Sequence, residues 1–343
     1  MTDIVLVLAW LVFAHLVADF VLQNDWIALN KGTGGRTGWA ALGTHGFHVG
    51  LCLFPTVLAF GWLAGLYVVI VVISHMLVDR WKVQATKRAE RSALEAARKR
   101  YPGPGGAPAS GLGSAWTPWP GMLFLADQAL HLLIAVLGWL IIMEGVPVQP
   151  WFAELVQTAL RSWSPAMFHA VVLTGVVLLS LFLVNTRGGY YFVLALVSPR
   201  ELPDAPTPDP EAPPEPAPAP TPSGYTVKVG PITATVNPGV APPEEAPPPV
   251  ETPPLRPKPA VPSGAPARIG ATIGALERLL IVGFILVGLD AAVGFVIAVK
   301  TIARFKQLDD RGFAEYYLLG TLASVSVAIG SAYLAVAAFS SLQ

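Results

Sequence analysis

The chain contains seven apolar runs, and each is long enough to cross a lipid bilayer as a helix. One crossing requires about 20 predominantly apolar residues. The runs are Ile4–Gln23, Ala41–Phe60, Leu63–Asp79, Met122–Met143, Met167–Asn185, Ala275–Lys300 and Ala314–Phe339. Only 13% of the 343 residues are charged, whereas soluble domains carry about 25%. The sequence therefore predicts an all-α protein, a polytopic transmembrane helical bundle.

The spacing of these runs divides the chain into four regions. We expect a four-helix transmembrane module, then the fifth span with its flanking segments, a proline-rich linker and a C-terminal pair of transmembrane helices. In order, the regions cover residues 1–145, 146–198, 199–268 and 269–343. A very short turn around Gly61 should make the second and third spans a tight hairpin. The charged, Ala-rich segment Arg88–Arg100 should continue the third span as a helix.

The linker differs from the rest of the chain in composition. It holds most of the 33 prolines, and such a segment stays extended because it cannot bury enough apolar surface to fold. Tyr225–Val229 and Ile232–Val236 alternate apolar and polar residues around Gly230-Pro231, which predicts a small β-hairpin. The linker would serve as a tether, or as an element that becomes ordered on a protein partner.

Basic residues set the expected orientation in the membrane. Eight of them lie between Arg80 and Arg100, which places that loop in the cytoplasm by the positive-inside rule. Alternating crossings then put the N-terminus outside and the segment after Asn185 inside. The same count places the basic residues of 300–311 outside, against the rule, unless Gly188–Val197 completes an extra crossing.

Composition also excludes two kinds of site. The 22 basic and 22 acidic residues cancel, so no strongly basic face indicates binding to nucleic acid. Cys52 is the only cysteine, which excludes a disulfide framework and a thiolate metal site within one chain.

The first run has neither a basic n-region nor an obvious cleavage site, and we expect a retained span instead of a signal peptide.

Ionisable residues recur in pairs inside the apolar runs. The pairs are His15/Asp19, His45/His48, His75/Asp79 and Asp127/His131. Residues three or four positions apart share one face of a helix. Each pair lies near one end of its run, and alternating crossings place all four ends at the cytoplasmic boundary. Because ionisable side chains are costly within a membrane, such a set indicates a functional site.

The residue types in these pairs predict a divalent-metal site. Imidazole and carboxylate ligands without a thiolate suit zinc first, with manganese or iron as alternatives. Eight potential ligands exceed the four of a closed structural zinc site, so two metals, or one metal with supporting carboxylates, would use them better. A proton or ion pathway and a purely structural polar network are the alternatives.

Polar residues beside the pairs could support such a site. Gln23 and Gln128 could serve as donors to the ligands. Arg80 and Lys82 follow the third pair, and either flank the span in the ordinary way or hold a phosphate or an anionic lipid head group.

The sixth run carries charged residues as well. Asp290 lies inside it, so its carboxylate would be buried and would require a partner. Glu277 and Arg278 open the run and are expected to act as an interfacial anchor.

Three segments resemble the DUF3307 family of bacterial membrane proteins, whose function is unknown. They are HLVADFVLQ (His15–Gln23), HMLVDRWK (His75–Lys82) and FLADQALH (Phe124–His131). The resemblance covers the first four spans and implies a multi-pass protein of the bacterial inner (cytoplasmic) membrane, surrounded by membrane lipids. ALERLLIVGF (Ala275–Phe284) and EYYLLGT (Glu315–Thr321) are similar to the C-terminal region of longer members, whereas the proline-rich insert departs from the family's compact pattern.

A looser similarity connects the chain to inner-membrane proteins described as metal-dependent hydrolases, which also place His and Asp at helix ends. It implies a hydrolase of a lipid or phosphate ester at the cytoplasmic interface, by analogy. An aspartate not used as a ligand, Asp19 or Asp127, would act as the general base. The alternatives are translocation of a metal or of protons, and a non-catalytic subunit of a larger membrane complex that docks through the proline-rich segment.

Overall fold

The computed structural model describes residues 4–102, 111–159, 161–200, 225–229, 232–236 and 265–340. Among these residues, seven helices are long and apolar enough to cross a membrane, which confirms the predicted fold class. Met1–Pro203 and Ala267–Gln343 together form one compact unit, and Asp204–Pro266 form a second. Most of the proline-rich linker lies outside the described residues, so its role as tether or docking element stays a prediction.

The second unit contains a two-stranded antiparallel hairpin. Strand β1 (Tyr225–Val229) pairs with β2 (Ile232–Val236), and Val229 lies opposite Ile232. These are the two segments in which apolar and polar residues alternate.

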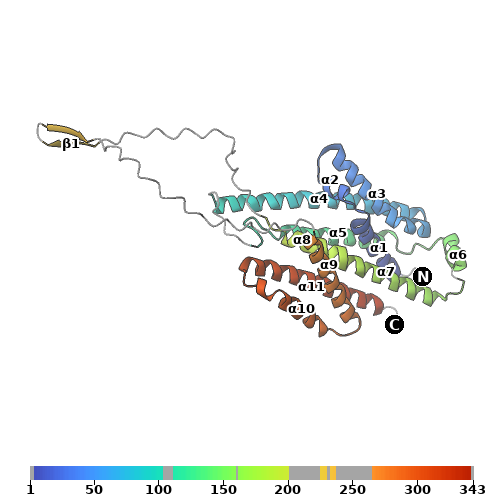
Figure 1. Ribbon diagram of the computed structural model, residues 1–343. Helices are drawn as coiled ribbons and strands as arrows, with labels where there is room; N and C mark the ends of the chain where they lie inside the picture. Colours follow the sequence, from blue (N-terminus) through green and yellow to red (C-terminus); the bar gives the residue numbers. More distant parts are fainter. Residues whose placement is uncertain are drawn as a thin grey trace. The chain divides into compact units, whose positions relative to one another are not determined.

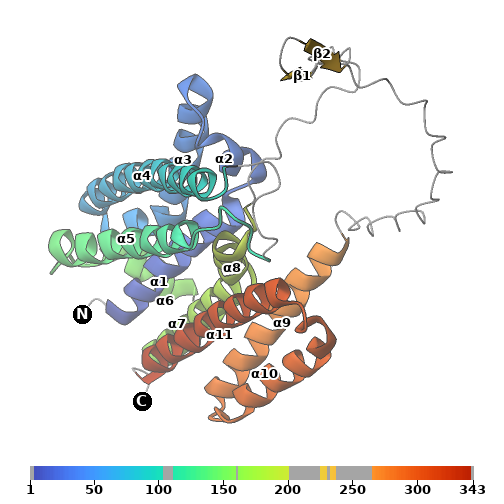
Figure 2. The ribbon, with the colours of Figure 1, turned by 90° about the vertical axis from the view of Figure 1, so that its left-hand side faces the viewer.

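The first four crossing helices form the part of the bundle that carries the His/Asp pairs. Helix α1 (Ile4–Val17) ends in a π-helical segment, η1 (Ala18–Leu22), and is followed by α2 (Asp25–Asn30), α3 (Gly35–Phe60), α4 (Trp62–Arg100) and α5 (Trp119–Ile142). Helix α4 packs against both α3 and α5 (Figures 1 and 2). It runs without a break through its charged last turns, as predicted.

A tight junction and two side-chain contacts fix how these helices meet. Gly61 joins α3 to α4 with a φ of 79°, a backbone conformation that favours glycine. Tyr67 of α4 is fully buried, and its hydroxyl donates to the Ala135 carbonyl of α5 at 2.8 Å. The Tyr67 ring also meets Trp139 edge-on, with centroids 5.4 Å apart. These contacts set the relative height of the helices that carry the pairs.

The fifth crossing helix is longer than expected. It consists of α7 (Pro165–Leu183), a second π-helical segment, η2 (Val184–Gly188), and α8 (Gly189–Val197). Gly188–Val197 is therefore not the extra crossing that the sequence left open, because the backbone stays helical through η2 and the apolar helix continues to Val197. A short helix that was not predicted, α6 (Pro150–Ala159), precedes it.

The predicted sixth span, Ala275–Lys300, has the wrong bounds, because the candidate membrane span there is Ile269–Leu286. The structure has two helices there, α9 (Ala265–Leu286) and α10 (Ala292–Ala303), separated by a turn in which Gly288 has a φ of 75°. Helix α10 returns along α9, since the Lys300 ammonium lies 2.6 Å from the Glu277 carboxylate. A 3-10 turn, η3 (Phe305–Gln307), and the last crossing helix, α11 (Arg311–Phe339), complete the chain.

This turn changes the environment of two charged residues. Asp290 is exposed at the turn, 3.4 Å from the Tyr333 hydroxyl, so the expectation that it is buried within a span is wrong. Arg278 is only 3% exposed, so it is not an interfacial anchor. Its guanidinium donates to the Asn185 carbonyl at 2.6 Å and to the Ser324 hydroxyl at 3.0 Å. It therefore joins α9 to η2 and α11 inside the bundle.

The return of α10 removes the conflict between the topology and the positive-inside rule. It places the basic residues of 300–311 at the same end of the bundle as the charged end of α4 (Figure 1). The backbone of Gly312 lies directly against Gly111, which closely follows that end of α4 in the sequence. Both basic segments can therefore lie on one side of a membrane.

This arrangement predicts which surface residues are accessible from outside a cell. In a Cys52→Ala background, we expect Glu154→Cys in α6 to react with an impermeant thiol reagent added to intact cells. Ser92→Cys in α4 and Lys306→Cys in η3 should react only after lysis, because basic segments are retained in the cytoplasm. Labelling of Lys306→Cys in intact cells would contradict the antiparallel α9–α10 pair as a membrane topology.

Candidate metal centre

Seven of the eight predicted ligands come together where α1, η1, α3, α4 and α5 meet. They are His15, Asp19, His45, His75, Asp79, Asp127 and His131. None is more than 7% exposed. Their ligand atoms form three groups, each within 4.8 Å: His15/Asp19/His75/His131, His45/His75/Asp79 and Asp79/Asp127/His131. The pairs predicted from the sequence thus meet in space and could hold metal.

The eighth predicted ligand, His48, does not join this cluster. It is half-buried, its ring lies 6.2 Å from that of Phe47, and it belongs to none of the three groups. His45 on the same helix is fully buried and faces the other pairs. The second pair therefore contributes one ligand to the cluster instead of two.

Three of the ligand atoms are spaced like the corners of a tetrahedral metal site. His45 Nε2 and His75 Nε2 are 3.0 Å apart, and Asp19 Oδ1 lies 3.4 Å and 3.3 Å from them. Ligands about 2.0–2.2 Å from a tetrahedral zinc ion are separated by roughly 3.3–3.6 Å. Asp79 Oδ2 lies 3.4 Å from His45 Nε2 on the same cluster. The three carboxylate–imidazole spacings match this range, whereas the 3.0 Å between the two imidazole nitrogens is that of a hydrogen bond.

The position of Asp19 follows from the end of the first helix. Its side chain belongs to η1, whose wider π-helical turn interrupts the regular α-helical pattern. Such single π-helical turns occur frequently at functional sites. Asp19 Oδ1 lies 3.8 Å from His15 Nδ1 and accepts no hydrogen bond from any described group. A buried carboxylate oxygen without a donor is costly unless a cation or a proton lies near it.

Gln128 determines which nitrogen of His15 is available for a ligand. Its side-chain nitrogen donates to Asp19 Oδ2 at 3.1 Å and to Asp127 Oδ2 at 3.2 Å, because ionised carboxylates can only accept. Gln128 Oε1 must then accept from His15 Nε2, which is 3.1 Å away. With its proton on Nε2, neutral His15 presents the lone pair of Nδ1 to Asp19. This bears out Gln128 as a donor beside the ligands.

His131 is held in the same way by the backbone. Its Nε2 lies 3.2 Å from the His75 carbonyl, which can only accept, so the proton of a neutral His131 ring resides there. The free Nδ1 faces Asp127 Oδ1 at 3.8 Å, and neither atom has a hydrogen-bond partner among the described residues. The ring also stacks on that of His75, with centroids 3.7 Å apart. Here, too, a lone pair faces a carboxylate across a gap.

Two lysines supply positive charge to the cluster. Lys31 is 8% exposed, and its ammonium donates to Asp79 Oδ1 at 2.7 Å and to Gln23 Oε1 at 2.8 Å. Burial alone would lower the pKa of Lys31, but the carboxylates of Asp79 and Asp19 outweigh burial and raise that pKa. Lys82 lies 3.7 Å from Asp127 and is more open to solvent.

Lys31 was not predicted as part of the site. It reaches the cluster because α2 folds back after α1, with the Asn24 side chain accepting from the Ile27 amide at 2.9 Å and Ile27 fully buried. An Asn three residues before a buried Ile is a helix-start signal that could have indicated α2. Arg80, by contrast, lies outside the cluster, with its guanidinium 4.9 Å from the centre of the Trp39 ring.

Comparison with known proteins supports the family resemblance for the part of the chain that holds this cluster. Residues 7–160 match the family described as "Protein of unknown function (DUF3307)". All seven clustered residues lie within that match. No curated protein and no solved structure matches the chain. The region that carries the candidate metal centre therefore matches the DUF3307 family, whose description names no activity.

The Lys31–Asp79 pair gives a prediction for stability. In metal-free protein, Lys31→Met should lower the free energy of unfolding by about 3–5 kcal/mol, because it leaves a buried carboxylate without its cation. Lys82→Met should cost less, since its contact is longer and water reaches it. Titration of the purified protein with a denaturing detergent, in the presence of a chelator, measures the free energy of unfolding of both variants. Equal losses in the two variants would show that Lys31 has no special role.

Proposed function

We propose that the protein binds a divalent cation at the His/Asp cluster, as an integral membrane metalloprotein of the bacterial inner membrane. This proposal rests on hydrogen-bond acceptor atoms that face each other inside the cluster. His15 Nδ1 presents a lone pair to Asp19 Oδ1 across 3.8 Å. Two acceptors repel each other when buried, and an ion between them would turn that repulsion into coordination.

The ligand types favour zinc, with manganese or iron as alternatives. Nitrogen and oxygen ligands at these spacings suit such ions, and Cys52 is the only thiol in the chain. His75, Asp79 and His131 each belong to two of the three groups, so neighbouring positions share ligands. Gln128, Lys31 and the His75 carbonyl hold these side chains in orientation, as supporting residues do around metal ligands.

We further propose that the site hydrolyses a lipid or phosphate ester at the cytoplasmic boundary of the membrane. A bound divalent ion would lower the pKa of a coordinated water towards neutrality. Asp19 Oδ1 lies close to two imidazole nitrogens, which suits a ligand. Asp127 Oδ1 is free of donors, and Lys82 lies beside the other oxygen of that carboxylate. We therefore assign Asp127 as the general base that takes a proton from water.

Burial of the cluster favours a second candidate, which is translocation of metal ions or protons. The four imidazoles and three carboxylates make close contacts from α1 to α5 without an exposed member. Rows of buried ionisable residues are typical of such pathways. Uptake of zinc or protons by liposomes containing the protein would favour this function over hydrolysis.

Metal binding should require the clustered histidine of the second pair and not its neighbour. We expect His45→Ala to weaken zinc binding at least about 10-fold, as the loss of even a supporting residue commonly does. His48→Ala is the matched control on the same helix and should bind zinc like the unchanged protein. Elemental analysis of detergent-purified protein after zinc loading measures both. Equal zinc content in the two variants would leave the cluster with a structural role.

The hydrolase reading gives a separate prediction for Asp127. Asp127→Asn keeps the shape of the side chain but cannot take a proton, so turnover should fall about 100-fold or more while zinc content is retained. A chromogenic phosphodiester and a chromogenic fatty-acyl ester in mixed micelles are suitable probes. If the unchanged protein binds zinc but turns over neither probe, translocation is favoured over hydrolysis.

A further inference from the structure

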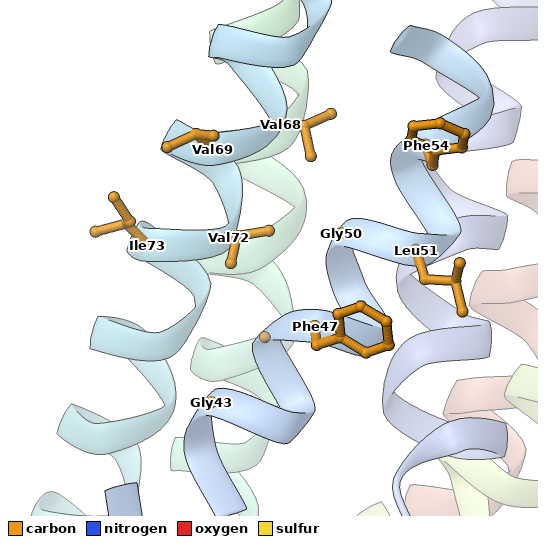
Figure 3. Close-up of a pocket in the computed structure, with 10 residues that line it drawn as sticks. Gly43, Phe47, Gly50, Leu51, Phe54, Val68, Val69, Val72 and Ile73 are labelled. Atoms are coloured by element: carbon orange, nitrogen blue, oxygen red, sulfur yellow. The ribbon is translucent and has the colours of Figure 1, made fainter. Parts of the chain in front are cut away.

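The lipid-facing seam between α3 and α4 contains an apolar groove of about 360 Å³ (Figure 3). All of its lining residues are apolar or glycine. Phe47 of α3 is 68% exposed and Ile73 of α4 is 55% exposed, on helices that are long enough to cross a membrane. The volume lies within the range of about 300–1,000 Å³ that is typical of ligand pockets. The groove therefore opens towards the hydrocarbon of the membrane.

Missing side chains on α3 create this groove. Gly43, Gly46 and Gly50 are spaced by three and four residues, so they share one face of the helix. Nothing lies within 4 Å of the position that a Gly43 side chain would take, whereas a methyl group on Gly46 would meet the Met76 sulfur at 2.8 Å. Gly46 thus closes the floor of the groove, and Gly43 keeps its cytoplasmic end open.

A cation and an aromatic ring lie further along the same seam. Trp39 precedes Gly43 by four residues and Arg80 follows Ile73 by seven, so both continue the faces that line the groove. They lie roughly 6 Å and 10 Å beyond it along the helix axes. The Arg80 guanidinium sits 4.9 Å from the centre of the Trp39 ring, and no carboxylate among the described residues pairs with it. Tryptophan beside arginine at this height is typical of the head-group region.

We propose that the groove holds one acyl chain of a glycerophospholipid from the cytoplasmic leaflet, whose phosphate is bound by Arg80 beside Trp39. Hydrocarbon already surrounds the protein, so an apolar surface alone does not select a lipid in a membrane. Selection requires shape, which the glycines provide, and charge, which the unpaired guanidinium provides for a phosphate. The proposal does not depend on metal binding at the His/Asp cluster.

Two matched pairs of variants test the proposal. Gly43→Leu fills the groove, and Gly283→Leu places the same side chain at another exposed helical glycine with open space around it. Arg80→Gln removes the phosphate contact, and Arg91→Gln removes an exposed arginine further along the same helix. The full chain is reconstituted in phosphatidylcholine vesicles with a phosphatidylglycerol probe that carries a photoreactive diazirine in one acyl chain. Crosslinked peptides are then quantified by mass spectrometry.

We expect crosslinks to concentrate on the peptides that line the groove in the unchanged protein. Gly43→Leu should abolish this preference, and Arg80→Gln should weaken it about fivefold, the effect of one basic contact with an anionic membrane surface. Both control variants should behave like the unchanged protein. Crosslinks spread evenly over the bundle, or groove labelling that Gly43→Leu leaves intact, would overturn the proposal. Full labelling of Arg80→Gln would overturn the assignment of Arg80 to the phosphate. Gel filtration of each variant checks folding independently.

Discussion

The carboxylates of Asp19, Asp79 and Asp127 cannot be held inside a helical bundle unless positive charge reaches them. A buried charge without a partner costs several kcal/mol, even after the protein relaxes around it. Lys31 and Lys82 provide two ammonium groups against the three carboxylates. One negative charge is left over when the histidines are neutral. A metal ion, or a proton on an imidazole or on a carboxylate, must balance it, and four histidines surrounding the same space suit the first two of these.

The sequence was sufficient to predict that these side chains meet. Depth in the membrane follows from position along each apolar run, and the face follows from the four-residue spacing of His15/Asp19, His75/Asp79 and Asp127/His131. The three-residue spacing of His45/His48 failed because His45 is fully buried against the cluster, whereas His48 lies at the half-buried edge of the same face. Lys31 could not be assigned, since its contact with Asp79 depends on how α2 folds back and not on any repeat in the sequence.

The C-terminal part shows where hydropathy is insufficient. The turn contains Gly288, Leu289 and Asp290. It interrupts the apolar run so little that the run resembles a single span. The charges contained a signal that hydropathy lacks, because a single span would export the basic residues of 300–311. Arg278 could not be placed from the sequence either. An arginine near the start of an apolar run is usually an anchor, and only the tertiary structure shows that the Asn185 carbonyl accepts from it.

The two π-helical segments connect the candidate metal centre to the rest of the bundle. A π-helical turn shifts the backbone pairing, and carbonyls freed within a membrane need another donor because no water is available. In η1, which carries Asp19, the Phe20 carbonyl accepts from Arg187 of η2 at 3.1 Å. In η2, the Asn185 carbonyl accepts from Arg278 of α9. Arg187, which lies outside the DUF3307 match, thus stabilises the turn that places Asp19, and Arg278 stabilises the segment that carries Arg187. The geometry of the cluster therefore depends on helices that contribute no ligand to it.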